Sequence, residues 1–203
     1  MHGLPASELE RTLESGILNG LAAGVAMGLF MMLASATWGH AGAFTPFYRI
    51  AAVLDRAAFD ISLEEAATGS RFWFEPQTAL PGACVHLALA AVFGVPFVLL
   101  AHDGRGARPL ALVLAGAAWG LVVAAVMVPV LRLAGRSVGG GALVAELPAQ
   151  LGWPTYLGMH LVYGLALGAV VALRVILRAR FGPAPERPVP GGEPDGLPPF
   201  RTG

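Results

Sequence analysis

Four long apolar stretches constrain the fold of this chain more than any other feature of its sequence. They cover residues 17–37, 82–101, 109–131 and 156–177. Each is about 20 residues long with almost no charge, the length that an α-helix needs to cross ~30 Å of hydrocarbon. Backbone N–H and C=O groups cannot stay unpaired in lipid, so each stretch is predicted to be a helix. The predicted fold class is an all-α membrane protein with four transmembrane helices.

The composition agrees with a membrane location and excludes several classes of function. Of the 203 residues, 56% are hydrophobic and 13% are charged, whereas soluble domains have about 25% charged residues. The formal net charge is zero, so nothing favours nucleic-acid binding. Cys84 is the only cysteine, which excludes an intrachain disulfide and a CxxC metal site.

The chain divides into three predicted parts. Residues 1–16 form an N-terminal segment, 17–181 a four-helix transmembrane domain, and 182–203 a tail rich in proline and glycine that is predicted to be disordered. Four spans place both termini on one side of the membrane, called here the terminal side; the other is the loop side. Arginines near the membrane favour a cytoplasmic terminal side in an inner (plasma) membrane. These are Arg105, Arg108, Arg174, Arg178 and Arg180.

The loop at 38–81 is too long for a simple turn. Residues 46–56 are amphipathic and begin with Pro46, which predicts a short helix lying in the interface. Ser62 and Glu65 have the spacing of a capping box, which predicts a second short helix starting there. An aromatic belt is expected on the loop side. Its predicted members are Trp38, Phe44, Phe47, Tyr48, Trp73, Trp153 and Tyr156.

An internal duplication is predicted from matching positions. The spacing from His86 to Gly94 recurs from His160 to Gly168. The first and third spans also align, with Leu18, Gly20, Gly24 and Met31 matching Leu114, Gly116, Gly120 and Met127. Two pseudo-repeated hairpins in the same orientation imply a pseudo-two-fold axis along the membrane normal. Both histidines then lie roughly 8 Å into their helices from the loop side, facing each other or a shared cavity.

Small residues recur every fourth position on these spans, which favours close packing of helix backbones. The longest stripe is Gly16, Gly20, Gly24 and Gly28. Shorter stripes are Gly116, Gly120 and Ala124; His86, Ala90 and Gly94; and His160, Gly164 and Gly168.

Several roles are open for the intramembrane histidines. The first is structural: a neutral imidazole bonded to a carbonyl or hydroxyl fixes helix register. A second is cofactor binding, with His86 and His160 as axial ligands of a b-type haem. A third is a divalent metal site held by His40, His86 and His160, with Glu146 or Asp55 as a fourth ligand. A fourth is proton coupling in a small transporter.

The chain also resembles a known group of proteins. The glycine-rich first span, the phrase TPFYRIAA at 45–52 and the His-Leu pairs of the later spans resemble uncharacterised small bacterial four-helix inner-membrane proteins, of the domain-of-unknown-function type. The resemblance covers about residues 17–177. It implies a four-helix membrane fold and carries no established activity.

The sequence contains no motif that names a reaction. We therefore predict an integral membrane accessory or interaction protein without enzymatic activity or cofactor, associated with a larger membrane complex or with further copies of itself. The alternatives are a haem- or metal-binding membrane protein that uses the histidine pair, and a small proton-linked transporter.

Overall fold

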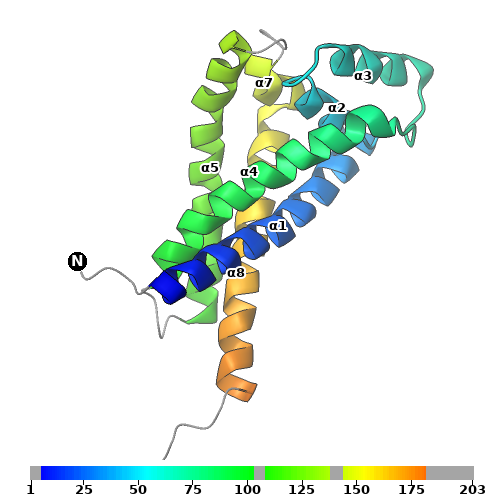
Figure 1. Cartoon of the computed structure of the whole chain (residues 1–203). Coiled ribbons are helices and arrows are strands. Elements are labelled where there is room, and N and C mark those ends of the chain that lie inside the picture. The colour runs from blue at the N-terminus through cyan, green and yellow to red at the C-terminus, as the bar shows by residue number, and fades with distance from the viewer. Residues whose placement is uncertain (1–5, 103–107, 138–143, 182–203) are drawn as a thin grey trace, which may run out of the picture.

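Long helices form the framework of the protein in the computed structural model, which describes residues 6–102, 108–137 and 144–181 (Figure 1). The described residues contain helices and no strand. The long helices are α1 (Ala6–Ala36), α4 (Pro76–His102), α5 (Pro109–Ser137) and α8 (Trp153–Phe181). All four are long and apolar enough to cross a membrane, as predicted. The tail predicted at 182–203 lies outside the described residues.

The helices extend beyond the apolar stretches. Helix α1 begins at Ala6, so helical structure covers residues 6–16 as well as the apolar stretch that follows them. Glu8 lies in the first turn, where a negative charge is favourable. The Thr12 hydroxyl donates a hydrogen bond to the Glu8 carbonyl at 2.8 Å. Hydropathy misses these turns because their residues favour helix while being charged.

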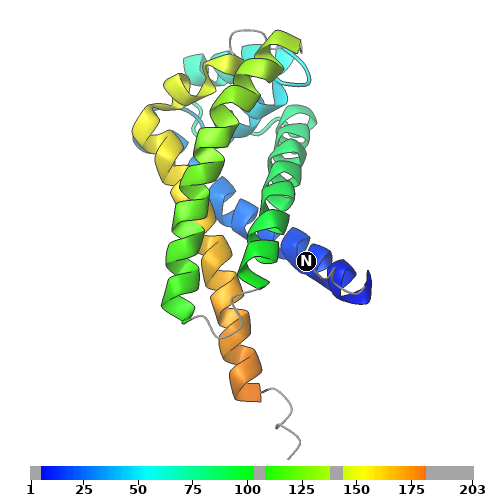
Figure 2. The same cartoon turned by 90° about the vertical axis from the view of Figure 1, so that its left-hand side faces the viewer.

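The four long helices form two antiparallel pairs. Helix α1 packs along α4, and α5 packs along α8. Helices α1 and α8 also pack against each other, whereas α4 and α5 make few contacts (Figures 1 and 2). The order across the molecule is therefore α4, α1, α8, α5, with the two outer helices separated along part of their length.

Glycines bring the backbones into contact within each pair. A Cβ atom added to Gly94 of α4 would lie 2.5 Å from the Gly16 carbonyl oxygen and 2.6 Å from the Gly20 Cα atom. A Cβ atom on Gly168 of α8 would lie 3.2 Å from the Gly116 Cα atom of α5. No side chain fits between backbones at these points, which explains the small-residue stripes.

Three short helices cover the loop side: α2 (Thr45–Ala51), α3 (Ala57–Thr68) and α7 (Leu147–Leu151). The predicted capping box at Ser62 is wrong, because α3 begins at Ala57. Asp55 Oδ1 accepts a hydrogen bond from Ala57 N at 2.9 Å, so an earlier acidic residue satisfies the start of this helix. The beginning of α1 and the end of α8 lie at the opposite end of the bundle (Figure 1).

The aromatic residues of the predicted belt divide into two groups. Trp38 and Trp153 are half-exposed, as a belt requires. Others are buried in the protein instead, so the belt prediction is wrong for Phe47, Tyr48 and Tyr156. The Tyr48 hydroxyl accepts a hydrogen bond from Glu75 N at 2.8 Å, which fixes α2 against the residues preceding α4.

Candidate functional site

A cavity of about 270 Å³ lies between the long helices, beside the limited contact between α4 and α5. The long helices α1, α4, α5 and α8 form its walls, and α2 and α7 cover its loop-side end. The lining side chains are mostly aliphatic, methionine and aromatic groups. This volume is slightly below the usual range of ligand pockets, which begins at about 300 Å³.

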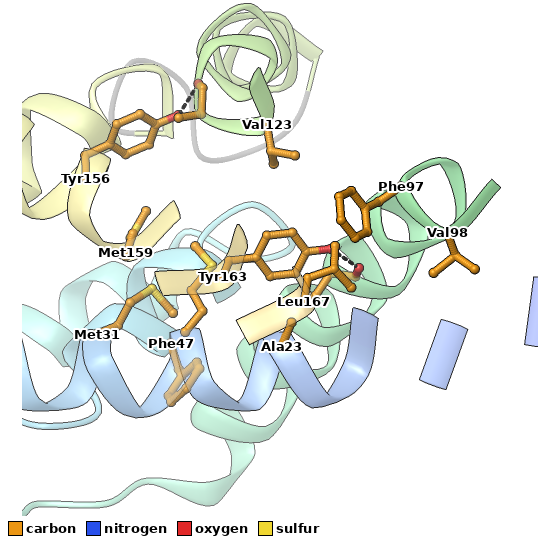
Figure 3. Close-up of a cluster of buried hydrophobic side chains, with 13 residues drawn as sticks. Ala23, Met31, Phe47, Phe97, Val98, Val123, Tyr156, Met159, Tyr163 and Leu167 are labelled. Atoms are coloured by element: carbon orange, nitrogen blue, oxygen red, sulfur yellow. Dashed lines mark hydrogen bonds between the residues drawn. The ribbon is translucent and has the colours of Figure 1, made fainter. Parts of the chain in front are cut away.

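Methionines form much of the wall. Met31 of α1 and Met159 of α8 lie close together in the core, beside Tyr156 and Tyr163 (Figure 3). Met27 and Met127 line the same cavity. Methionine side chains are flexible and polarizable, so such a wall can adapt its shape to an occupant.

His86 connects α4 to α1 at this cavity. Its side chain is 7% exposed, and its Nε2 atom lies 2.9 Å from the Gly24 carbonyl oxygen. Because a carbonyl only accepts, Nε2 carries the proton and Nδ1 keeps its lone pair. The Phe47 ring of α2 packs edge-on against the imidazole, with the ring centroids 6.0 Å apart.

His160 is anchored within its own helix. It is 4% exposed, and its Nδ1 atom donates a hydrogen bond to the Tyr156 carbonyl at 2.8 Å, one turn earlier in α8. Its Nε2 atom and the His86 Nδ1 atom form no hydrogen bond within the described part of the chain. Both histidines line the same cavity, as predicted from their equal depth.

Two tyrosines of α8 connect this helix to α4 and α5 through hydrogen bonds. The Tyr163 hydroxyl donates to the Ala90 carbonyl of α4 at 2.7 Å, and the Tyr156 hydroxyl donates to the Ala124 carbonyl of α5 at 2.8 Å (Figure 3). Sequence reasoning missed these bonds, although two tyrosines seven residues apart share one face of a helix.

Arg49 is the cavity residue that the sequence did not reveal. It lies on α2 and lines both the large cavity and a smaller pocket beside it. Its side chain is partly buried, and its buried Nε atom has no hydrogen-bond partner among the described residues. Burial lowers the pKa of the Arg49 guanidinium, because a low-dielectric environment disfavours the charged form. The available signal was an arginine within an otherwise apolar stretch of a short amphipathic helix.

His40 lies elsewhere. It lines a separate pocket together with Glu65 and Arg71, and its backbone adopts a left-handed conformation with φ of 49°. The described residues contain no group of three or more His, Cys, Asp or Glu side chains that could hold a metal ion. The structure therefore brings His86 and His160 to one cavity without His40, Glu146 or Asp55.

Glu65 is the other unusual group near the loop side. It is 2% exposed, and its Oε2 atom accepts a hydrogen bond from the Thr45 hydroxyl at 3.1 Å. Its Oε1 atom is buried and has no partner among the described residues. Burial raises the pKa of the Glu65 carboxyl, and the Thr45 hydrogen bond opposes this shift. Glu65 thereby joins α3 to the start of α2.

Comparisons with known proteins give no assignment, since no protein-family model, no curated protein and no solved structure matches the chain. The resemblance to small four-helix membrane proteins stays a prediction. Functional inference therefore depends on the cavity and its polar groups.

Proposed function

We propose that this chain is a multi-pass protein of a bacterial inner membrane that binds a small apolar or amphipathic molecule in the cavity between α4 and α5. It acts as an accessory protein that holds its ligand without transforming it. The observation that carries this proposal is the apolar cavity itself, which is lined by the four long helices and by residues of α2 and α7.

The exposed surface supports membrane insertion. Large apolar side chains point outward along the long helices, for example Leu29, Leu100 and Leu110, which are 61%, 68% and 68% exposed. Soluble proteins rarely expose apolar patches this extensive. Small residues, by contrast, occupy the contacts between helices, the distribution expected when lipid surrounds the bundle.

The register of the helix pairs supports an origin from two repeated hairpins. Gly94 packs against Gly20 in the first pair, and Gly168 packs against Gly116 in the second. These are the positions that align in the predicted duplication. On this proposal the cavity lies between two related hairpins, and each contributes one histidine to it.

An apolar cavity of this size favours an occupant. Side chains around an empty cavity lose dispersion contacts, and unfilled volume destabilises a protein roughly in proportion to its size. Water is a poor occupant of the aliphatic part of this cavity, because apolar cavities stay dry. A lipid-soluble molecule restores those contacts, and it can reach the cavity from the bilayer between α4 and α5.

Photolabelling tests the proposal. The full chain in lipid nanodiscs is exposed to a diazirine derivative of hexadecanol, and labelled residues are mapped by peptide mass spectrometry. We expect saturable labelling of cavity-lining residues such as Met127, with competition by unlabelled hexadecanol. In Ala134→Phe, which places a ring in the cavity, we expect labelling to fall about tenfold.

The matched control is Ala125→Phe, which adds the same ring to the same helix at an exposed position outside the cavity lining. Its cavity labelling should equal that of the natural chain. Labelling that spreads evenly over the outer faces, does not saturate and is unchanged in Ala134→Phe would overturn the proposal.

A second candidate function is metal or haem binding by the histidine pair. Ligating histidines usually donate their other ring N–H to a carbonyl or carboxylate, and His86 and His160 both donate to backbone carbonyls. Thioethers of the neighbouring methionines are ligands for soft ions such as Cu(I). Metal analysis and an absorption spectrum of purified protein, repeated for His86→Ala, decide between these hypotheses.

A further inference from the structure

Arg49 lies at the loop-side end of the large cavity and also lines the smaller, more polar pocket beside it. It lies on α2, which covers the loop-side end of the bundle, whereas Phe93 and Tyr163 line the cavity farther along α4 and α8. An amphiphile with its head at Arg49 would therefore place its chain between the long helices. This is the order of polar and apolar groups that a lipid has at a membrane surface.

Within the described part of the chain, the two pockets that Arg49 lines have no carboxylate in their walls: no aspartate or glutamate lines the large cavity or the smaller pocket beside it. The buried Nε atom has no hydrogen-bond partner there either. A cation taken out of water is costly unless it is paired, so the site is electrostatically complementary to an anion.

The smaller pocket adds neutral polar groups on the same side. Ser35 and Thr155 line it together with Arg49. The Thr155 hydroxyl oxygen accepts a hydrogen bond from the Trp38 indole at 3.1 Å, which leaves its own hydrogen available for an acceptor. An anionic head at Arg49 would thus meet a guanidinium, with five N–H donors, and a nearby hydroxyl.

From these contacts we infer that the ligand is a single-chain lipid with an anionic carboxylate or phosphate head, bound with its head at Arg49 and its chain in the cavity. A volume of about 270 Å³ is about nine times that of a water molecule in the liquid, which suits a segment of one acyl chain. This inference rests on the proposed ligand-binding function and names its ligand class.

The test compares two probes with the same chain in the full protein in nanodiscs. One is a diazirine derivative of hexadecanoic acid, ionised at about pH 8, and the other is the corresponding alcohol. We expect the acid to label the cavity at about tenfold lower concentration than the alcohol, because charge-assisted hydrogen bonds are the stronger ones. Free inorganic phosphate should not displace the acid probe. If phosphate displaces the acid as well as unlabelled hexadecanoic acid does, the site recognises the anion alone, and a lipid ligand is overturned.

Variants then assign the preference to Arg49. In Arg49→Gln the acid and the alcohol should label equally, and Arg49→Lys should restore a preference for the acid because it keeps the charge. Arg56→Gln, an exposed arginine outside the cavity lining, should behave like the natural chain. If Arg49→Gln binds neither probe, restored acid labelling in Arg49→Lys still supports the role of the charge.

The outcomes separate this inference from the function on which it rests. Equal labelling by acid and alcohol in the natural chain overturns the anionic head and leaves the cavity as a binding site. A preference for the acid that survives in Arg49→Gln overturns the role of Arg49. Saturable cavity labelling by neither probe overturns both proposals together.

Discussion

Individual polar side chains inside the bundle donate hydrogen bonds to backbone carbonyls of neighbouring helices. His86, Trp119 and Tyr163 each make such a bond across a helix interface. A carbonyl in a helix keeps a second lone pair that can accept another donor. Bonds of this kind contribute only about 0.6 kcal/mol each on average inside membranes. Their main effect here is to fix the register of the helices around the cavity.

Glu65 is expected to make stability depend on pH. Its carboxyl is buried and has a raised pKa, so the folded protein holds this proton more tightly than the unfolded chain does. Between the ordinary pKa and the raised one, stability should therefore fall as the pH rises. Glu65→Gln removes this dependence, and at about pH 8 it should make the protein more stable than the natural chain.

Thermal unfolding in detergent at about pH 5 and about pH 8 checks this expectation. The control is Glu64→Gln, which removes an exposed carboxyl from the same helix, and its melting temperatures at both pH values are compared with those of Glu65→Gln. A Glu65→Gln protein that is less stable than the natural chain at the higher pH would show that the ionised carboxylate is a favourable partner of Thr45.

Among individual residues, the sequence predicted the histidine pair and missed Arg49. The shared depth of His86 and His160 was predicted by counting residues from expected helix starts. The structure begins α4 at Pro76, well before the expected start, and α8 at Trp153, yet both histidines line the same cavity. Arg49 could not be placed in this way, because α2 covers the cavity through tertiary packing that local periodicity does not specify. His40 shows the same limit, since the fold of a long loop decides where its side chains lie.

At the scale of helices, hydropathy located the four spans and understated their length. The charged first turns of α1 and the first residues of α4, at 76–81, belong to the helices. They lie outside the apolar stretches. The starts of the short helices were harder to predict. Asp55 and Ser62 lie in one loop, and each is a residue type that often stands at the start of a helix. The sequence predicted that the glycine stripes pack closely against other helices, but it did not predict which helix each stripe contacts.

The close contact between α5 and α8 can be tested by two glycine substitutions in α8. A Cβ atom on Gly164 would lie 2.7 Å from Gly120 N of α5, whereas a Cβ atom on Gly158 would meet only the Phe30 ring at 3.5 Å. Gly164→Ala should destabilise the protein by about 1–3 kcal/mol, because two backbones must separate. Gly158→Ala should be neutral or stabilise by up to ~1 kcal/mol through helix propensity.

Melting temperatures of the two variants in the same detergent measure this difference. Both substitutions add one methyl group to the same helix, so helix propensity cancels in the comparison. Equal stability of the two proteins would mean that α5 and α8 do not approach each other at Gly164.

At the scale of the whole molecule, four spans place the start of α1 and the end of α8 on one side and α3 on the other. For the orientation in an inner membrane that the arginines predict, in a Cys84→Ala background, Glu10→Cys and Arg178→Cys should react with an impermeant maleimide only after that membrane is opened. Glu64→Cys should react in spheroplasts with an intact inner membrane. All three positions are exposed.

Labelling of Glu10→Cys and Glu64→Cys from the same side would contradict the four-span arrangement. Labelling of all three positions with the opposite accessibility would keep the four spans and reverse the orientation. The unsubstituted Cys84→Ala protein supplies the background signal.

The glycine contacts within both helix pairs have a consequence for how this sequence can change over time. Substitutions among aliphatic residues on the outer faces alter little, so those positions are free to drift as long as they stay apolar. At Gly20, Gly94, Gly116 and Gly164 even a single methyl group meets another backbone. The range of tolerated substitutions should therefore vary with the helical period along each long helix, a pattern that hydropathy does not reveal.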